Sequence, residues 1–236
     1  MKNRISIFAA ACLLYIPLIA ASYHQERLAL LKNKGFNPQV IYDIGAHYGN
    51  WTAEIQNVFN RAQFFLFEAN DYYKPWLQRL NAPCFFALLG NREESVTFYT
   101  NNSSGDSVFR EQTHYYADGS FRENLVPMTT LDTIIQKNGL PLPDLIKMDV
   151  QGAEKLIIKG GLPIVCNAHV IILEVGILEY NKGAPLMHEM MVLMDELGYC
   201  VLDVLELHYI PTRELIQIDL LFVKKGSPLI KSGILC

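Results

Sequence analysis

A short turn with two glycines, Asp-Ile-Gly-Ala-His-Tyr-Gly at 43–49, stands between an apolar run at 40–42 and a helix-like stretch that begins at Asn50. A second apolar run, at 64–67, follows that stretch and ends on Glu68. A strand, a glycine-bearing turn, a helix and a second strand ending in a carboxylate make up one βαβ unit. The sequence therefore predicts a parallel sheet with a ligand site at the carboxyl ends of its strands.

The turn has the residues of a ligand-binding loop. Gly45 and Gly49 have no Cβ, so the backbone can approach a ligand closely at either position. Ala46 and His47 lie between them, and we expect His47 to shape the turn or contact the ligand rather than act as a base. The other interpretation is a tight strand-to-helix turn that binds nothing.

The negative charge at the start of the turn distinguishes between two classes of nucleoside cofactor, dinucleotides and S-adenosylmethionine. The dinucleotide fingerprint is G-x-G-x-x-G, but Asp43 stands at its first glycine position and Asn50 near its third. A carboxylate repels a pyrophosphate and favours the ammonium or sulfonium group of S-adenosylmethionine, whose own carboxylate suits the amides that open a helix. Glu68 can accept hydrogen bonds from both ribose hydroxyls. An NAD(P)-dependent oxidoreductase is therefore the less favoured alternative.

Two further carboxylates follow predicted strands. Asp149 ends the run at 145–148, and Glu174 ends the run at 170–173. Together with Glu68 they fall at the edge of an α/β sheet where ligands bind. Asp149 is the first candidate for a general base and Glu174 the second. The alternatives are that Asp149 caps the next helix or binds the amino group of the cofactor, and that Glu174 holds a loop.

The order of strands and helices predicts an α/β fold. We expect a three-layer sandwich around a mostly parallel, seven-stranded, Rossmann-like sheet. Predicted strands at 199–205 and 216–224 are joined without a long helix, so the last strand should be antiparallel. A single strand is predicted at 84–89. The polar segment 101–123 is a long insert, and its His114, Tyr115 and Tyr116 could line an acceptor pocket.

Several strings in order resemble the FkbM family of S-adenosylmethionine-dependent methyltransferases, from about Val40 to about Lys225. They are Y-D-I-G-A-H-Y-G-N-W-T, F-L-F-E-A-N, T-T-L-D-T-I, L-I-K-M-D-V-Q-G-A-E and I-I-L-E-V. The most specific piece is K-M-D-V-Q-G-A-E, where the family usually has K-[IV]-D-[VI]-E-G-x-E. Gln151 stands where the family usually has Glu, and Ala69 where it often has Pro.

The resemblance implies O-methylation of a hydroxyl on a sugar, glycan or small metabolite, with Asp149 and Glu174 as catalytic candidates. The expected cofactor-binding residues are Asp43, Gly45, Ala46, His47, Gly49, Glu68, Ala69 and Asn70. Gln151 removes one negative charge from the site. The alternative is therefore a catalytically weakened binding protein, anchored to a membrane or exported, on the same fold.

The first residues have the character of a targeting segment. Residues 5–21 are almost all apolar and follow Lys2 and Arg4, as in a signal peptide or a membrane anchor. We expect 1–22 to be that segment and 23–236 the methyltransferase domain. Since S-adenosylmethionine is made in the cytoplasm, an anchor with the domain on the cytoplasmic face is favoured, and an exported or periplasmic protein is the alternative.

Charge and histidine spacing limit the partners. The net charge of −4 and the lack of a long basic run argue against a nucleic-acid partner. The six histidines show no H-x-x-x-H or H-E-x-x-H spacing, so no metal site is expected. The expected partner is a small-molecule or glycan acceptor, with membrane attachment through residues 5–21.

Overall fold

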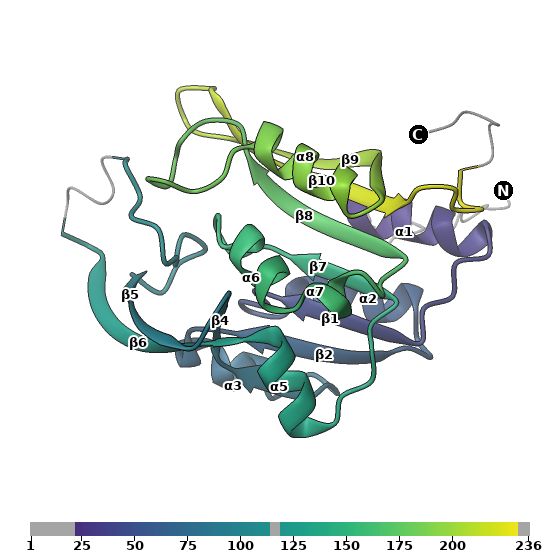
Figure 1. Ribbon diagram of the computed structural model, residues 1–236, viewed down its shortest axis with the longest axis horizontal. Helices are drawn as coiled ribbons and strands as arrows, with labels where there is room; N and C mark the ends of the chain where they lie inside the picture. Colours follow the sequence, from purple (N-terminus) through teal and green to yellow (C-terminus); the bar gives the residue numbers. More distant parts are fainter. Residues whose placement is uncertain (1–21, 114–118, 231–236) are drawn as a thin grey trace, which may run out of the picture.

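The computed structural model describes residues 22–113 and 119–230 and contains a seven-stranded sheet (Figure 1). Its strand order is β3-β2-β1-β7-β8-β10-β9. Neighbouring strands are parallel from β3 to β8, whereas β10 runs antiparallel to both β8 and β9. The expected α/β fold with one antiparallel strand at the end of the chain is therefore confirmed. The strands are β1 (Val40–Ile44), β2 (Gln63–Glu68), β3 (Cys84–Phe86), β7 (Leu145–Met148), β8 (Val170–Gly176), β9 (Tyr199–Tyr209) and β10 (Leu215–Lys224).

Helices cover both faces of this sheet, which gives the expected three layers (Figure 1). One core contains side chains of α5, α6, α7 and α8, and the other contains side chains of α1, α2 and α3. All five residues of β1 are buried, and Ile41 and Tyr42 belong to opposite cores, as expected for a strand covered on both faces. The helices are α1 (Tyr23–Asn33), α2 (Asn50–Val58), a 3₁₀ turn η1 (Asp71–Tyr73), α3 (Lys74–Leu77), α5 (Leu131–Asn138), α6 (Glu154–Gly160), α7 (Leu162–Val165) and α8 (Met187–Glu196).

A second, three-stranded sheet has the order β4-β6-β5, with β4 (Leu88–Gly90), β5 (Glu94–Thr100) and β6 (Arg122–Thr130). The prediction of one strand at 84–89 was therefore wrong. That segment divides into β3 at the edge of the large sheet and β4, which pairs in parallel with β6. β3 pairs with β2, which precedes it in the chain (Leu66 lies opposite Cys84), whereas β4 pairs with β6, which follows it (Leu88 lies opposite Met128). Local apolar spacing carries no information on such partners.

Local sequence explains how α5 is bounded. The Thr130 side chain accepts a hydrogen bond from the backbone N–H of Thr133 and caps the first turn. Gly139 then takes a left-handed conformation with φ of 61°, the usual way for glycine to end a helix. This helix follows β6 directly, so the small sheet is joined rigidly to a helix that packs on the large one.

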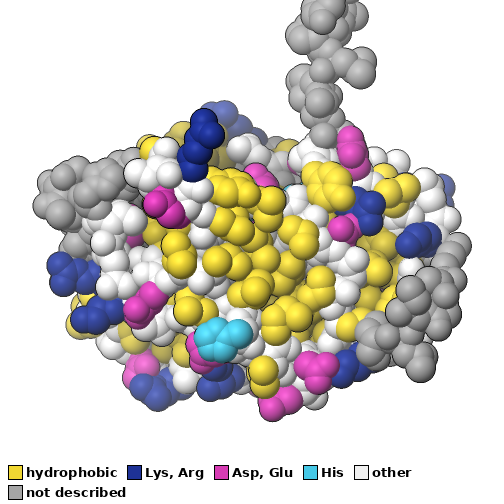
Figure 2. All heavy atoms as spheres, turned by 90° about the horizontal axis from the view of Figure 1, so that it is seen from above, with side chains coloured by type: hydrophobic (Ala, Val, Ile, Leu, Met, Phe, Trp, Pro, Cys, Tyr) yellow, Lys and Arg dark blue, Asp and Glu magenta, His cyan; other side chains and the backbone are white. Residues whose placement is uncertain are grey.

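The face that carries α8 and β9 shows many hydrophobic side chains (Figure 2). Exposed hydrophobic residues on these two elements include Val192 on α8 and Val204 and Leu207 on β9. β9 is one of the two edge strands of the large sheet. This edge therefore presents apolar side chains to its surroundings.

Two sets of expectations lie outside the described residues. They are the targeting segment at 5–21 and the acceptor-lining role of His114, Tyr115 and Tyr116. Among residues 22–113 and 119–230, no helix has the length and apolar character needed to cross a membrane.

Candidate active site

A cavity of about 710 Å³, including its open mouth, lies at the carboxyl ends of β1, β2 and β7. The small sheet and the loop that follows β5 form its opposite wall. This is the place where parallel α/β sheets bind ligands. Its lining includes Gly45, His47, Glu68, Ala69, Phe98, Asp106, Asp149 and Gln151.

Glu68 is the acid that faces this cavity from the end of β2. Its Oε2 accepts a 2.7 Å hydrogen bond from the backbone N–H of His47, and its Oε1 accepts a 2.9 Å bond from the N–H of Asn70. Each carboxylate oxygen can accept a second bond, so the group retains acceptor capacity toward the cavity. Burial raises the pKa of Glu68 to about 7, although the two backbone N–H groups oppose this rise.

Asp43 lies behind the turn, outside the cavity lining, and is fully buried. The Thr52 hydroxyl donates a 2.6 Å hydrogen bond to its Oδ2, and the Lys147 ammonium lies 3.6 Å from its Oδ1. Burial raises the pKa of Asp43, and Lys147 opposes that rise. The expectation that Asp43 faces the sulfonium of a cofactor does not fit this geometry, because its charge is directed at Lys147.

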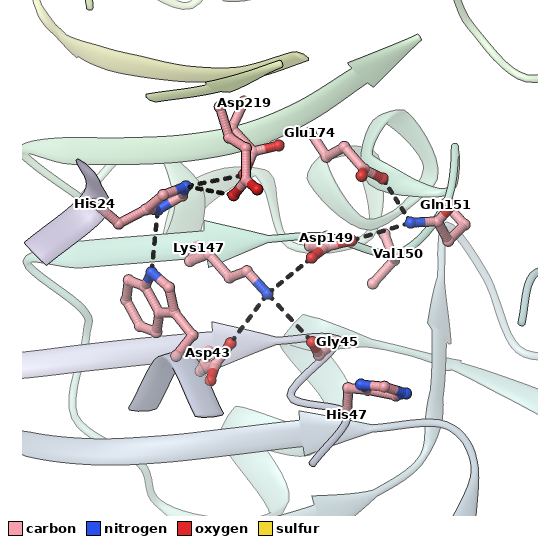
Figure 3. Close-up of polar contacts among 12 residues, drawn as sticks. His24, Asp43, Gly45, His47, Lys147, Asp149, Val150, Gln151, Glu174 and Asp219 are labelled. Carbon is pink, nitrogen blue, oxygen red and sulfur yellow. Dashed lines mark hydrogen bonds and ion pairs between the residues drawn. The ribbon is translucent and has the colours of Figure 1, made fainter. Parts of the chain in front are cut away.

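Lys147 connects the turn to Asp149, whereas the sequence alone favours a solvated lysine there, with pairing to a carboxylate as the alternative (Figure 3). Its ammonium lies 3.2 Å from Oδ2 of Asp149 and donates a 3.3 Å hydrogen bond to the carbonyl of Gly45. Burial alone would lower the pKa of Lys147, but the carboxylates of Asp149 and Asp43 raise it above its ordinary value. The available signal was a lysine within a strand otherwise made of Leu, Ile and Met.

The two glycines of the turn are required by contacts within the protein. A Cβ on Gly45 would overlap with the backbone carbonyl oxygen of Asp149, and one on Gly49 would overlap with the Leu80 side chain. Both have positive φ, 78° and 79°. The sequence suggested that a ligand comes close to these glycines. In the structure it is protein that comes close: the end of β7 at Gly45 and the segment after α3 at Gly49.

The structure brings only part of the expected cofactor set to the cavity. Gly45, His47, Glu68 and Ala69 line it, whereas Asp43, Ala46, Gly49 and Asn70 do not. The Asn70 side chain instead donates hydrogen bonds to Thr100, Asn102 and Asp106 and so fixes the loop after β5. Asn70 thus supports the cavity wall that this loop forms.

Gln151 lies between the two catalytic candidates (Figure 3). Its Nε2 donates to Oδ1 of Asp149 at 3.2 Å and to Oε2 of Glu174 at 2.7 Å. Asp149 lines the large cavity, but Glu174 does not and instead lines a smaller one of about 290 Å³. Burial, together with Asp149 and Asp219, raises the pKa of Glu174 well above its usual range. The two acids are thus linked but face different cavities.

The turn that holds Gln151 has a strained backbone and is held by side chains from other segments. Gln151 has a φ of 54°, and Gly152 follows with a φ of 99°. The Gln151 carbonyl accepts 2.8 Å hydrogen bonds from the side chains of Ser107 and Asn181. Ser107 comes from the insert after β5, so the insert fixes the residue that joins the two acids.

The sheet order, the single reversed strand and a cavity with acids at the ends of β2 and β7 define the class I methyltransferase fold. The family description "Methyltransferase FkbM domain" matches residues 43–201. The chain belongs to this family, and it is an S-adenosylmethionine-dependent methyltransferase.

Individual relatives are more distant. The chain is 25% identical over 183 residues to the 2-O-methyltransferase NoeI of Sinorhizobium fredii (strain NBRC 101917 / NGR234), covering 71% of this chain and 74% of NoeI. Similar solved structures include two other methyltransferases. One is precorrin-6y C5,15-methyltransferase of Geobacter metallireducens GS-15, with a TM-score of 0.45 and 16% identity over 84% of this chain and 88% of that one. The other is magnesium protoporphyrin IX methyltransferase of Synechocystis PCC 6803, with a TM-score of 0.46 and 11% identity over 86% of this chain and 80% of that one.

Proposed function

We propose that this protein binds S-adenosylmethionine in the large cavity and methylates a hydroxyl group of a sugar, glycan or small metabolite. The cofactor assignment is supported by the family and by Glu68. The acceptor class is supported by the resemblance to NoeI, which is named as a 2-O-methyltransferase. Bound there, the cofactor supplies a methyl group already activated by its sulfonium.

The observation that carries the cofactor site is the orientation of Glu68. Backbone N–H groups of His47 and Asn70 hold its two oxygens in place, and the carboxylate lines the cavity. A fixed carboxylate with free lone pairs is suited to accept hydrogen bonds from two neighbouring ribose hydroxyls. His47 and Gly45 line the same cavity and would contact the rest of the cofactor.

Asp149 is the residue that we assign to the proton of the acceptor hydroxyl. It lines the cavity, and its two oxygens are oriented by Lys147 at 3.2 Å and by Gln151 at 3.2 Å. A carboxylate held in this way can accept the hydroxyl proton as the oxygen attacks the methyl carbon. Glu174 is enclosed behind Gln151, so we assign it to positioning Gln151 rather than to proton transfer.

Cofactor binding is tested by calorimetry of the full chain with S-adenosylmethionine, S-adenosylhomocysteine and NAD. We expect the first two to bind and NAD not to bind. Glu68→Ala should weaken binding of S-adenosylhomocysteine by about 1–3 kcal/mol, because two hydroxyl contacts are lost. Glu196→Ala, on the exposed side of α8, is the control and should leave the affinity unchanged. Unchanged affinity in Glu68→Ala would defeat the ribose assignment.

Catalysis is tested by transfer of labelled methyl from S-adenosylmethionine to a panel of monosaccharides and short glycans. Asp149→Asn should retain cofactor affinity and lose at least a hundredfold in turnover, since a general base typically contributes about 10²–10⁴-fold. Full activity in that variant would remove Asp149 from the catalytic role. Cofactor binding without transfer to any acceptor would favour the alternative of a weakened binding protein.

We also propose that residues 5–21 attach the domain to the cytoplasmic face of a membrane. The support is the apolar sequence after Lys2 and Arg4 and the cytoplasmic origin of the cofactor. Membrane fractionation of the full chain should place it in the membrane fraction, with the domain protected from protease added outside the cell. A protein found in the soluble cytoplasmic fraction, or digested from outside, contradicts this proposal.

A further inference from the structure

A second cluster of ionisable side chains lies away from the cofactor cavity, on β8, β9 and β10. Glu174 and Asp219 are directly opposite each other on the antiparallel pair β8 and β10, and only 6% and 5% of their surfaces are exposed. His208 reaches the same place from β9. Its Nε2 lies 3.0 Å from Oδ1 of Asp219 and 3.9 Å from Oε1 of Glu174. One donor atom from each of the three lies within 4.8 Å of the other two.

Two buried carboxylates facing each other need a compensating positive charge. Like charges directly opposite on neighbouring strands destabilise a sheet, and burial removes the water that would screen them. The closest buried lysine, Lys147, forms ion pairs with Asp43 and Asp149 at the cofactor turn. Asp219 has the imidazoles of His24 and His208 within 3.0 Å, whereas among the described residues Glu174 accepts hydrogen bonds only from neutral amides. A cation bound between Glu174, Asp219 and His208 would place a positive charge beside both carboxylates.

The outward oxygens of the pair are held by other donors, whereas the inward oxygens, Oδ1 of Asp219 and Oε1 of Glu174, both face Nε2 of His208. Oε2 of Glu174 accepts 2.7 and 2.8 Å hydrogen bonds from the side-chain amides of Gln151 and Gln217. Its Oε1 is directed toward His208. Metal-binding carboxylates are typically oriented by this kind of outer hydrogen bond.

His24 orients Asp219 in the same way, and its tautomer follows from its neighbours. The indole N–H of Trp51 donates a 3.2 Å hydrogen bond to Nδ1 of His24, so Nδ1 carries no proton. The proton of neutral His24 is then on Nε2, which donates to Oδ2 of Asp219 at 3.0 Å (Figure 3). His24 is thus a supporting donor and not a metal ligand, although it also lies close to Glu206.

We propose that Glu174, His208 and Asp219 bind a divalent first-row transition-metal ion. One imidazole and two carboxylates are a mixed nitrogen and oxygen set, which suits Mn²⁺ or Zn²⁺ better than Mg²⁺ or Ca²⁺. The His208 side chain is 32% exposed, so an ion can enter from that side, and water completes the coordination. The site joins the active site through Gln151, which contacts both Glu174 and Asp149.

The test is metal binding by the full chain, and it does not depend on methyl transfer. Chelator-treated protein is dialysed against Mn²⁺ or Zn²⁺, and bound metal is measured by elemental analysis and, for Mn²⁺, by electron paramagnetic resonance. We expect one equivalent of at least one of the two ions. His208→Gln should lower the affinity at least tenfold, whereas His188→Gln, at an exposed position on α8, should not.

A second variant keeps the result interpretable if one variant folds poorly. Asp219→Asn keeps the shape of the side chain and removes one charged ligand, so it should also lower the affinity at least tenfold. Circular dichroism checks that each variant is folded. Less than a tenth of an equivalent of either ion on the wild-type chain, or equal affinity in wild type and a folded His208→Gln, overturns the proposal. If the wild-type chain binds no metal, the His208 imidazolium is the only positive charge that the described residues place beside Glu174 and Asp219.

Discussion

The side-chain amide of Gln151 donates a 2.7 Å hydrogen bond to Oε2 of Glu174 and also contacts Asp149 at 3.2 Å. A residue with a left-handed backbone thus joins the acid at the large cavity to the acid of the second cluster. Because an amide can donate to both carboxylates, glutamine at this position holds together two acids that would otherwise repel each other.

Gln151→Glu should therefore destabilise the protein. The change replaces a donor by a third carboxylate within hydrogen-bonding distance of Glu174 and Asp149. We expect a loss of about 2–3 kcal/mol in the free energy of unfolding, as for a buried acceptor left without a donor. Urea denaturation at pH 8 measures it, with exposed Gln78→Glu as the control. A Gln151→Glu variant as stable as that control would contradict this account.

Glu68→Gln should change how stability depends on pH. Burial raises the pKa of Glu68 from 4.5 to about 7 in the folded protein, so the fold favours the protonated form. Its contribution to stability is fully present below pH 4.5 and is lost as the pH rises to about 7. The difference in unfolding free energy between Glu68→Gln and wild type should therefore shift in favour of the variant by on the order of 1–3 kcal/mol between pH 4.5 and 8.

The measurement is chemical denaturation of both proteins across that pH range, without cofactor. The readout is the pH dependence of the difference, because a glutamine amide also loses one of the two backbone hydrogen bonds at every pH. A difference that stays constant from pH 4.5 to 8 would show that the folded protein does not raise the pKa of Glu68.

Lys147→Met should leave the carboxylate of Asp43 buried without its cation. Both side chains are almost completely buried, at 7% and 0% exposure. Removing one partner of such a pair typically costs about 3–5 kcal/mol. The double variant with Asp43→Asn should recover part of that loss, because the uncompensated charge is then absent. Lys155→Met breaks the half-exposed pair with Glu189 and should cost no more than about 1 kcal/mol.

Denaturation of the single and double variants measures this coupling. If Lys147→Met and Lys155→Met cost the same, the ion pair behind the turn does not hold the site together.

Gly45→Ala should cost far more than a glycine substitution with the same backbone conformation elsewhere. Gly45 has a φ of 78°, and a Cβ there would overlap with the Asp149 carbonyl. Gly183 has a φ of 82° with nothing within 4 Å of such a Cβ. Gly183→Ala should lose about 1 kcal/mol from backbone strain alone. Gly45→Ala should lose several times as much and should also lose methyl transfer. Equal stability of the two variants would disprove the contact between the turn and the β7 end.

Much of the fold and part of the site could be predicted from the sequence, because the relevant signals are local. Apolar runs that end on Glu68, Asp149 and Glu174 identify strands and place acids at the same edge of a parallel sheet. The short link between β9 and β10 predicts the reversed strand. Glu68 and Asp149 do line the cavity, since residues at strand ends share one edge whatever packs around them.

The residue pattern was enough to predict the α/β sheet, the edge that carries Glu68 and Asp149 and, through several strings between Val40 and Lys225, the family, because each of these signals is local in the chain. The packing of distant segments determines which side chains face the cavity and which face one another. It turned Asp43 toward Lys147, divided 84–89 between two sheets, and brought His208 beside Glu174 and Asp219. Side-chain alternation along a strand specifies a face of the sheet, whereas the neighbour across that face depends on strand order and register, which involve residues far apart in the chain.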